Sequence, residues 1–418
     1  MTQKKESLFQ YVGFRNLWVG QLVSQFGDVL HSMVFLWMVL EVTGRREAVG
    51  IVGAFEALPA VIFSMHSGVW ADRYNRKQIL LWTDWISTVF VLGFAVLMLF
   101  VAKPALWVIC FFAFILKAVG VFALPARGAA IPRLVPSERL MEANALNSTV
   151  QNLMPLAGNV LAALVFQVIF ALNKTFTYFI TFLFNGCTFL VSALFMLRLP
   201  DLYPEREASP HSTLHEVKEG LTYIRKSVVL TASIGVSTAL NFFLAPFMTA
   251  MVVVVQERFQ GTPAMLAILE TGFFCGMGIG ALLTYRLKPK RVGLTFSLFL
   301  ALAAVSVVPM GYVHSPILFW ICNFLCGICI PPASIPLNTM VQIQTPDALR
   351  GRVSATMGML SMLVMPIGTA LSGLLLKQWG IEGTFLYMGL GLGIVPLLVL
   401  SIREFREVRL EELPSAQA

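Results

Sequence analysis

Four ionisable residues interrupt long apolar stretches of this sequence: Asp28, Glu56, Lys117 and Glu270. Placing such a group inside a membrane-spanning helix costs at least ~2.5 kcal/mol, so each one is a functional candidate by default. A carboxylate in this setting can take up and release a proton, and an ammonium group can neutralise it or compete for it. No nucleophile–base set, zinc motif or phosphate-binding loop accompanies them, so we assign no catalytic or metal-binding residue.

The elements that would hold these residues are membrane-spanning helices. The 418 residues are 57% hydrophobic and 12% charged, which is about half the charged share of a soluble protein. Apolar runs of roughly 20 residues, each long enough to cross ~30 Å of hydrocarbon, follow one another along the chain. We predict an all-α integral membrane protein with twelve transmembrane helices, at about residues 16–42, 49–70, 78–101, 104–127, 141–171, 175–197, 227–255, 263–285, 291–312, 315–340, 350–377 and 382–402.

The net charge of +8 reflects how the chain is oriented in the membrane and does not indicate a nucleic-acid partner. If the N-terminus is cytoplasmic, most of the 30 Lys and Arg residues fall on the cytoplasmic side of the predicted helices. This asymmetry is the positive-inside rule, and it predicts that both termini are cytoplasmic.

The two halves of the chain echo each other about 211 residues apart. Pro136 opens a stretch that ends in Pro155-Leu-Ala-Gly158, and Pro346 opens one that contains Pro366-Ile-Gly368. Parallel repeats of this kind occur in transporters whose two bundles rock about a central site. The predicted organisation is an N-terminal six-helix bundle, a cytoplasmic linker with an interfacial helix, a C-terminal six-helix bundle and a cytoplasmic tail, at residues 1–197, 198–226, 227–402 and 403–418.

A short charged loop separates the second and third predicted helices. It reads Gly68-Val-Trp-Ala-Asp72-Arg73-Tyr-Asn-Arg76-Lys77. This stretch resembles the cytoplasmic loop of the major facilitator superfamily, Gly-x-x-x-Asp-Arg-x-Gly-Arg-Lys/Arg. Asn75 stands where that pattern prefers glycine, and we expect a left-handed turn there because Asn tolerates this conformation next best.

The loop predicts a latch on the cytoplasmic side. Asp72 is expected where the second helix leaves the membrane, and the eleventh helix is expected to begin near Arg350-Gly351-Arg352. The N–H groups and dipole of a helix N-terminus attract a carboxylate, and such a latch would contribute ~1–3 kcal/mol to a conformational equilibrium. The alternative is that the loop cations are topology anchors that contact anionic lipid; these are Arg73, Arg76 and Lys77.

Longer stretches resemble the drug/proton antiporters that include macrolide efflux proteins. They are Phe14-Arg-Asn-Leu-Trp-Val-Gly-Gln-Leu-Val-Ser-Gln-Phe-Gly-Asp28, Pro125-Ala-Arg-Gly-Ala-Ala-Ile-Pro-Arg-Leu-Val-Pro136, and Arg350-Gly-Arg-Val-Ser354 with Met365-Pro-Ile-Gly368. The resemblance spans nearly the whole chain and implies the major facilitator fold, with two pseudo-symmetric six-helix bundles. Two departures stand out: Gly158–Ala163 lacks the proline of the antiporter motif, and Lys117 stands where the fourth helix often carries Arg.

Each intramembrane candidate has two interpretations. Asp28 and Lys117 either form a simple ion pair, or a proton or cationic substrate competes with Lys117 for Asp28. Glu56 and Glu270 have no cation nearby in the sequence; one of them carries a proton, or both line a water-exposed wall. His31 either orients Asp28 or packs in the core. Asp84, on the third helix, is interpreted as an anchor for the loop cations.

The sequence therefore predicts a secondary active transporter and not an enzyme. We expect proton-coupled efflux of lipophilic or amphipathic small molecules, as in macrolide or multidrug export, by alternating access. The alternatives are a dedicated siderophore exporter or a lysophospholipid flippase on the same fold, and a membrane-embedded enzyme, which no motif supports. The expected partners are a small-molecule substrate, protons and the lipid bilayer, with no cofactor and no nucleic acid. The expected form is a monomer in the bacterial plasma (inner) membrane.

Overall fold

The computed structural model describes residues 7–101, 103–169, 174–204, 213–287 and 289–409. Across these ranges the chain is helical, and its β-type pairing is a single isolated bridge between Arg291 and Arg409. By its contacts the chain forms two compact units: unit 1 comprises residues 1–43 and 55–210, and unit 2 comprises residues 44–54 and 211–418. The prediction of an all-α integral membrane protein is confirmed.

Eleven helical stretches within the described residues are long and apolar enough to cross a membrane. The fifth predicted span corresponds to a 30-residue helix, α5 (Leu140–Ile169), which is long enough to cross a membrane. The twelve-helix prediction therefore holds approximately.

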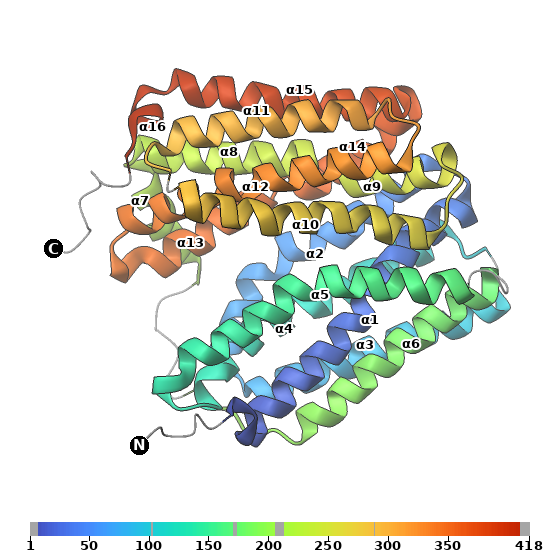
Figure 1. Ribbon diagram of the computed structural model, residues 1–418. Coiled ribbons are helices and arrows are strands. Elements are labelled where there is room, and N and C mark those ends of the chain that lie inside the picture. Colours follow the sequence, from blue (N-terminus) through green and yellow to red (C-terminus); the bar gives the residue numbers. More distant parts are fainter. Residues whose placement is uncertain (1–6, 102, 170–173, 205–212, 288, 410–418) are drawn as a thin grey trace, which may run out of the picture. The chain divides into compact units, whose positions relative to one another are not determined.

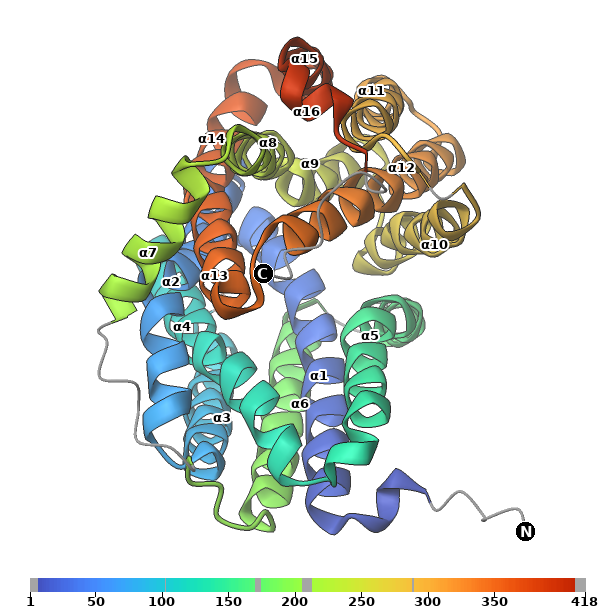
Figure 2. The ribbon, with the colours of Figure 1, turned by 90° about the vertical axis from the view of Figure 1, so that its left-hand side faces the viewer.

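Unit 1 is a bundle of long helices that run side by side (Figures 1 and 2). Short 3-10 turns join some of them, where prolines and a Ser-Glu-Arg stretch interrupt the apolar pattern. Its helices are η1 (Leu8–Gln10), α1 (Val12–Thr43), α2 (Arg46–Arg73, with its first residues in unit 2), α3 (Arg76–Phe100), α4 (Leu106–Ala130), η2 (Ile131–Arg133), η3 (Ser137–Arg139), α5 and α6 (Lys174–Leu197).

An aromatic cluster forms part of the core of unit 1. The rings of Phe94 on α3 and Phe112 on α4 stack with centroids 4.1 Å apart, and Phe35 on α1 and Phe182 on α6 pack edge-on around them. Such aromatic pairs contribute ~0.5–1.5 kcal/mol each beyond their buried area. The cluster therefore fixes four helices against one another.

Unit 2 holds the remaining helices. They are α7 (Thr213–Arg225), α8 (Val228–Leu244), α9 (Phe247–Val253), the π-helix η4 (Val254–Arg258), α10 (Pro263–Leu287), α11 (Val292–Met310), α12 (Pro316–Gln344), α13 (Asp347–Met362), α14 (Met365–Gln378), α15 (Gly380–Ser401) and α16 (Arg403–Glu407). The seventh and eleventh predicted spans are each broken, at Pro246 between α8 and α9 and just before Pro366 at the start of α14. Proline cannot donate the backbone hydrogen bond that a continuous helix needs, which accounts for both breaks.

Gly272, Gly276 and Gly280 recur every four residues in the sequence, a spacing that predicts a ridge of small residues on one helix face, and this face of α10 packs against α12. A Cβ atom at Gly276 would overlap the Phe324 carbonyl oxygen, and one at Gly280 would overlap the Ile328 carbonyl oxygen. Gly327 on α12 is equally close to the Phe273 backbone. Small residues allow this backbone approach, which replaces the missing hydrophobic driving force between helices in lipid.

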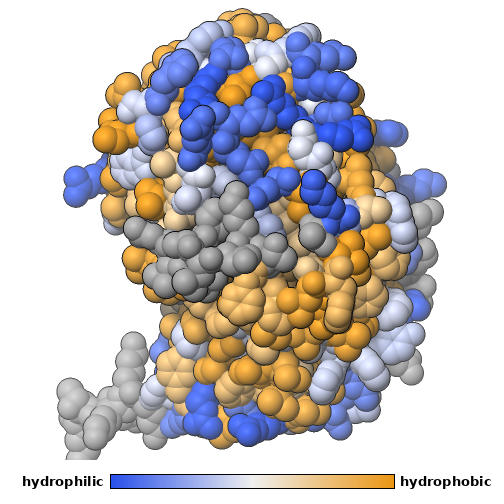
Figure 3. Space-filling view, turned by 90° about the vertical axis from the view of Figure 1, so that its right-hand side faces the viewer, coloured by the Kyte–Doolittle hydropathy of each residue, from blue (hydrophilic) through white to orange (hydrophobic). Residues whose placement is uncertain are grey.

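The surface of unit 2 has both hydrophilic and broad hydrophobic areas. Figure 3 faces the end that carries the α14–α15 turn, where hydrophilic residues gather beside broad hydrophobic areas. Large apolar side chains on α11 and α15 are exposed, among them Val305 at 70% and Leu397 at 64%. An apolar surface of this kind is typical of a protein solvated by lipid.

Candidate functional site

Three of the predicted intramembrane residues come together in unit 1. Lys117 on α4 forms an ion pair with Glu56 on α2, with Nζ and Oε1 3.4 Å apart. The Asp28 carboxylate on α1 lies near enough for its charge to act on the same ammonium group. The structure therefore corrects two expectations: the ion-pair partner of Lys117 is Glu56, and Glu56 has a cation beside it. The sequence hid this contact because the two residues lie on different helices.

The exposure of these groups favours an aqueous site over a dry ion pair. The side chain of Lys117 is 44% exposed and that of Glu56 is 16% exposed, and the Asp28 side chain is exposed although it lies well inside a 32-residue helix. Charged groups inside membrane spans usually face a water-filled cavity or one another. These three residues face one another.

Asp28 is also bordered by α6. Asn185 lies beside its carboxylate. The approach depends on Gly27, where a Cβ atom would overlap Thr188 and Asn185 of α6. A glycine next to the candidate residue is thus the local reason that α1 and α6 meet closely at this point.

A second carboxylate, Asp84 on α3, lies deeper in the same unit. Asp84 is 3% exposed, and the Ser192 hydroxyl on α6 donates a hydrogen bond of 2.6 Å to its Oδ2. The Arg127 guanidinium, in the last turn of α4, acts electrostatically on both Asp84 and Asp28. The cation that acts on Asp84 is Arg127 and not one of the loop cations, so the interpretation of Asp84 as an anchor for those cations was wrong.

Arg127 and Ser192 were missed as site residues. Arg127 is the last residue of the fourth predicted span, 104–127, so the sequence pattern groups it with the cytoplasmic cations. Its position one helix turn inside that end could have been a signal. For Ser192 the sequence offers none, since a serine in an apolar helix is ordinary.

His31 packs in the aromatic cluster of unit 1. Its ring is 3% exposed and stacks on Phe35 with centroids 5.1 Å apart, with Phe182 at 5.2 Å. Of the two interpretations of His31, the structure therefore supports packing.

Glu270 lies in unit 2, on α10. It is 9% exposed, and the carbonyl of the preceding residue, Leu269, accepts a hydrogen bond of 2.9 Å from the Asn323 amide of α12. Its role stays a prediction.

The charged loop between α2 and α3 is held by side-chain hydrogen bonds. Asn75 has φ −61° and ψ 114°, so the left-handed turn expected there is wrong. Asn75 instead caps α3: its Oδ1 accepts from the backbone N–H groups of Lys77 (3.1 Å) and Leu202 (3.0 Å), while its amide donates to Asp201. Asn is among the most favoured N-cap residues, because its side-chain oxygen accepts a hydrogen bond from a backbone N–H of the first helical turn.

The cations of this loop have different environments. Arg76 is 9% exposed, and its Nε donates a hydrogen bond of 3.1 Å to the Ala71 carbonyl. This bond connects the start of α3 to the end of α2. Asp72 and Arg73 are exposed, and Lys77 is partly exposed. A Cβ atom at Gly68 would meet open space. Arg76 is therefore a structural residue, and the exposed Asp72 carboxylate acts on its charge.

The predicted latch residues of unit 2 lie on α13. This helix begins at Asp347 rather than near Arg350, so Arg350 and Arg352 lie about one turn inside it. Arg352 donates a hydrogen bond of 2.6 Å to Glu219 of α7. The close approach of α7 requires Gly220, because a Cβ atom there would lie 2.6 Å from Thr356 Oγ1. The sequence missed Glu219 as a partner because α7 and α13 are more than a hundred residues apart.

A further set of ion pairs, which no sequence pattern indicated, joins the start of α2 to other parts of unit 2. Arg46 donates to Glu257 and, at 2.9 Å, to the Leu376 carbonyl, while Lys377 pairs with Glu47 at 3.1 Å. Below them, a Cβ atom at Gly50 would lie 2.8 Å from the Gly373 Cα. The first turns of α2 are thus fixed to α14 by charge and by close backbone packing.

Comparison with known proteins identifies the family to which this chain belongs. A family model described as Major Facilitator Superfamily matches residues 17–369 and 247–418. The chain belongs to the major facilitator superfamily. The fold and the repeated bundles follow from this membership, and the resemblance read from the charged loop is confirmed.

The curated relatives of this superfamily member include efflux proteins. Macrolide efflux protein A of Streptococcus pyogenes is 25% identical over 401 residues, which cover 95% of this chain and 98% of the relative. Multidrug efflux pump Tap of Mycolicibacterium fortuitum is 24% identical over 401 residues, which cover 93% and 95%. The chain is a multi-pass membrane transporter, and transporters of this superfamily take small-molecule substrates.

Solved structures of other members share the fold. A bacterial homolog of the human lysosomal transporter Spinster, in an inward-facing and unoccupied conformation, aligns with a TM-score of 0.72 at 11% identity and covers 97% of each chain. A POT family transporter in complex with a thioalcohol-conjugated peptide aligns with a TM-score of 0.71 at 13% identity and covers 95% of this chain and 97% of that chain. At these identities the likeness concerns the fold alone.

Proposed function

We propose that this protein exports lipophilic or amphipathic small molecules by alternating access, driven by proton entry. The observation that carries the proposal is the Glu56–Lys117 ion pair with Asp28 beside it. The efflux names of its curated relatives support the direction of transport. We further propose a plasma-membrane monomer with both termini cytoplasmic, which the distribution of Lys and Arg supports.

The chemistry of the cluster is suited to coupling. One ammonium group faces two carboxylates, so the ionised cluster carries one surplus negative charge. A proton on Glu56 removes the charge that holds Lys117, which then is free to neutralise Asp28 more completely. A cationic substrate near Asp28 would compete with Lys117 in the same way, so proton and substrate bind in mutual competition. Glu270 is proposed as a second proton-carrying group, in unit 2.

The direct test is transport in proteoliposomes with an imposed pH gradient. Cationic drugs, neutral macrolides and lysolipids are compared as substrates, with and without a protonophore. We expect uptake of at least one drug class to follow the gradient and collapse when the gradient is dissipated. Glu56→Gln, Asp28→Asn and Glu270→Gln then identify the carriers. Transport that ignores the gradient refutes proton coupling, and activity restricted to lysolipids supports a flippase.

We also propose that Asp72 forms a cytoplasmic latch with the α13 segment that carries Arg350 and Arg352. The exposed carboxylate of Asp72 and the two guanidinium groups support it. Because Arg352 pairs with Glu219 in this structure, forming the latch involves an exchange of partner for that residue. An exchange between two similar carboxylates changes the free energy little, as a reversible latch requires.

Asp72→Asn is expected to lower transport about fivefold or more, which corresponds to a coupling free energy at the lower end of the usual range. Membrane insertion and yield are expected to stay unchanged, since Asp72 is exposed. Initial transport rates per inserted protein measure the effect. Glu138→Gln, at another exposed carboxylate outside the loop, is the control. Equal rates in Asp72→Asn and the control would remove the latch.

A further inference from the structure

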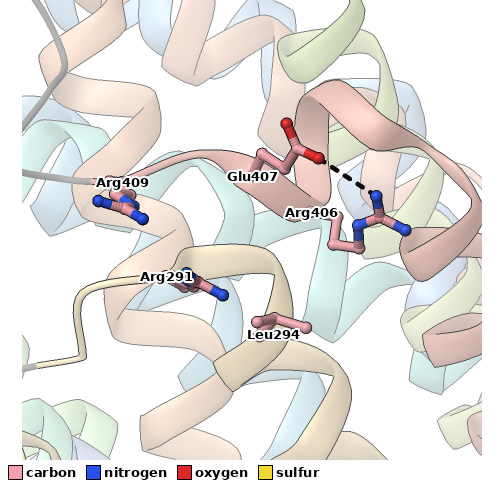
Figure 4. A pocket seen from close by; sticks show the side chains of 5 residues that line it. All are labelled: Arg291, Leu294, Arg406, Glu407 and Arg409. Carbon is pink, nitrogen blue, oxygen red and sulfur yellow. Dashed lines mark hydrogen bonds and ion pairs between the residues drawn. The ribbon is translucent and has the colours of Figure 1, made fainter.

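An open recess with a predominantly cationic lining lies at the end of unit 2 where α11 begins. Its volume is about 500 Å³, and Arg291, Leu294, Arg406, Glu407 and Arg409 line it. Three guanidinium groups face one carboxylate, so the lining carries a net positive charge. Figure 4 shows Arg291 and Arg409 along one side and Arg406, ion-paired with Glu407, along the other. None of these residues belongs to the transport site proposed above.

The recess is a built part of the fold, because the segment after α15 is anchored to α11. The Val292 N–H donates 3.1 Å to the Val408 carbonyl. Phe405 is fully buried, and a Cβ atom at Gly293 would lie 2.8 Å from the Arg406 Cα. These contacts fix the backbone that presents the arginines. The positions of the cations therefore follow from backbone packing and are not the chance result of long side chains on a surface.

The backbone pairing places two like charges opposite each other. Arg291 and Arg409 form an antiparallel bridge, and directly opposed residues in such a bridge have Cβ atoms roughly 4.5–5.5 Å apart. Like charges in opposed positions are destabilising. An anion between the two guanidinium groups would make charge-assisted contacts with both, and guanidinium groups match the oxygen geometry of phosphate. Arg291 also precedes the first turn of α11, which has no side-chain cap and whose dipole favours an anion.

An apolar ridge leads away from the recess along α11. Leu294 lines the recess and is 37% exposed, and Leu298, Leu302 and Val305 follow it at helical spacing with 58%, 46% and 70% exposure. Residues three or four apart lie on one face of a helix, so these four side chains form a continuous strip. A headgroup in the recess would place an attached acyl chain along this strip.

We propose that the recess binds the phosphate group of an anionic phospholipid, whose acyl chain follows the α11 ridge. On the orientation predicted from the cation distribution, the lipid belongs to the cytoplasmic leaflet, where anionic lipids attract clustered Lys and Arg. The ridge favours a lipid over a soluble phosphate, because a phospholipid contacts both the arginines and the apolar strip, whereas a free phosphate contacts the arginines alone. The site is independent of the substrate and of proton coupling.

The test is binding of phosphatidylglycerol to the purified, delipidated full-length protein, measured by native mass spectrometry. The variant Arg291→Gln/Arg406→Gln/Arg409→Gln is expected to bind about tenfold more weakly than the wild type, because several charge-assisted contacts are lost together. The control Arg15→Gln/Arg225→Gln/Lys226→Gln removes the same charge at exposed positions elsewhere and is expected to bind as the wild type does. Equal binding by the two triple variants overturns the site.

Two further measurements use the wild type alone, so the proposal does not depend on the folding of a variant. Phosphatidylglycerol is expected to bind about tenfold more tightly than zwitterionic phosphatidylcholine, and equal affinity overturns the proposal. Glycerol phosphate at the same concentration is expected to leave the bound lipid in place, since it lacks the acyl chain. Its complete displacement of the lipid would assign the recess to soluble phosphates and overturn the lipid assignment.

Discussion

Replacing Lys117 by methionine is expected to reduce transport roughly ten- to hundredfold. This reduction is the size that the usual coupling free energy between two linked sites produces. The substitution keeps the length of the side chain and removes the charge that balances Glu56, 3.4 Å away, and acts on Asp28. Because the Lys117 side chain is 44% exposed, water offsets part of the lost pairing, and we expect a stability loss of only ~1–2 kcal/mol. Transport rates in proteoliposomes and thermal unfolding in detergent measure the two effects separately.

The double variant Lys117→Met/Glu56→Gln distinguishes a functional pair from a structural one. Removing both partners leaves no uncompensated charge in the pair, so stability is expected to return close to that of the wild type. Transport is expected to stay low because the exchangeable proton and its competitor are gone. Lys103→Met, in the loop before α4, is the matched control and is expected to change neither property. Full recovery of transport in the double variant would show that the pair is structural.

Gly276→Val is expected to prevent stable assembly of unit 2. A Cβ atom at this position would overlap the Phe324 carbonyl oxygen and lie 2.9 Å from the Ile328 backbone nitrogen. Both neighbours are backbone atoms of α12, which cannot rotate aside as a side chain can. Overpacking in a tight core costs ~1–3 kcal/mol even when side chains can adjust, so we expect a loss at or above ~3 kcal/mol and little folded protein. Fluorescence-detected size-exclusion chromatography of detergent extracts measures the folded fraction.

Gly278→Val, two residues along the same helix, is the control for that experiment. A Cβ atom at Gly278 has no atom within 4 Å and the position is exposed. The control changes the intrinsic helix propensity in the same way and leaves the α10–α12 contact intact. We expect a monodisperse protein at near wild-type yield. Similar yields for the two variants would show that the close approach of α10 and α12 does not limit stability.

The sequence was sufficient for those properties that depend on its one-dimensional pattern. The length and spacing of apolar runs predicted membrane-spanning helices, because each helix must satisfy its own backbone hydrogen bonds in lipid. Gly272, Gly276 and Gly280 predicted a contact ridge because residues four apart share a helix face. The charged loop and the stretches such as Phe14–Asp28 indicated the superfamily. Each of these signals lies within one element or one loop.

Conformation and pairing required the tertiary structure. The sequence suggested a left-handed turn at Asn75, but the chain segment at Leu202 comes close and makes it an N-cap bonded on two sides. The pairing of Lys117 with Glu56, and of Arg352 with Glu219, joins residues on different helices. Which helix faces meet is decided by the summed packing of many apolar side chains, and a charged group pairs with whatever that packing brings within reach. The identity of the candidate residues was therefore readable from the sequence, whereas their partners were set by the fold.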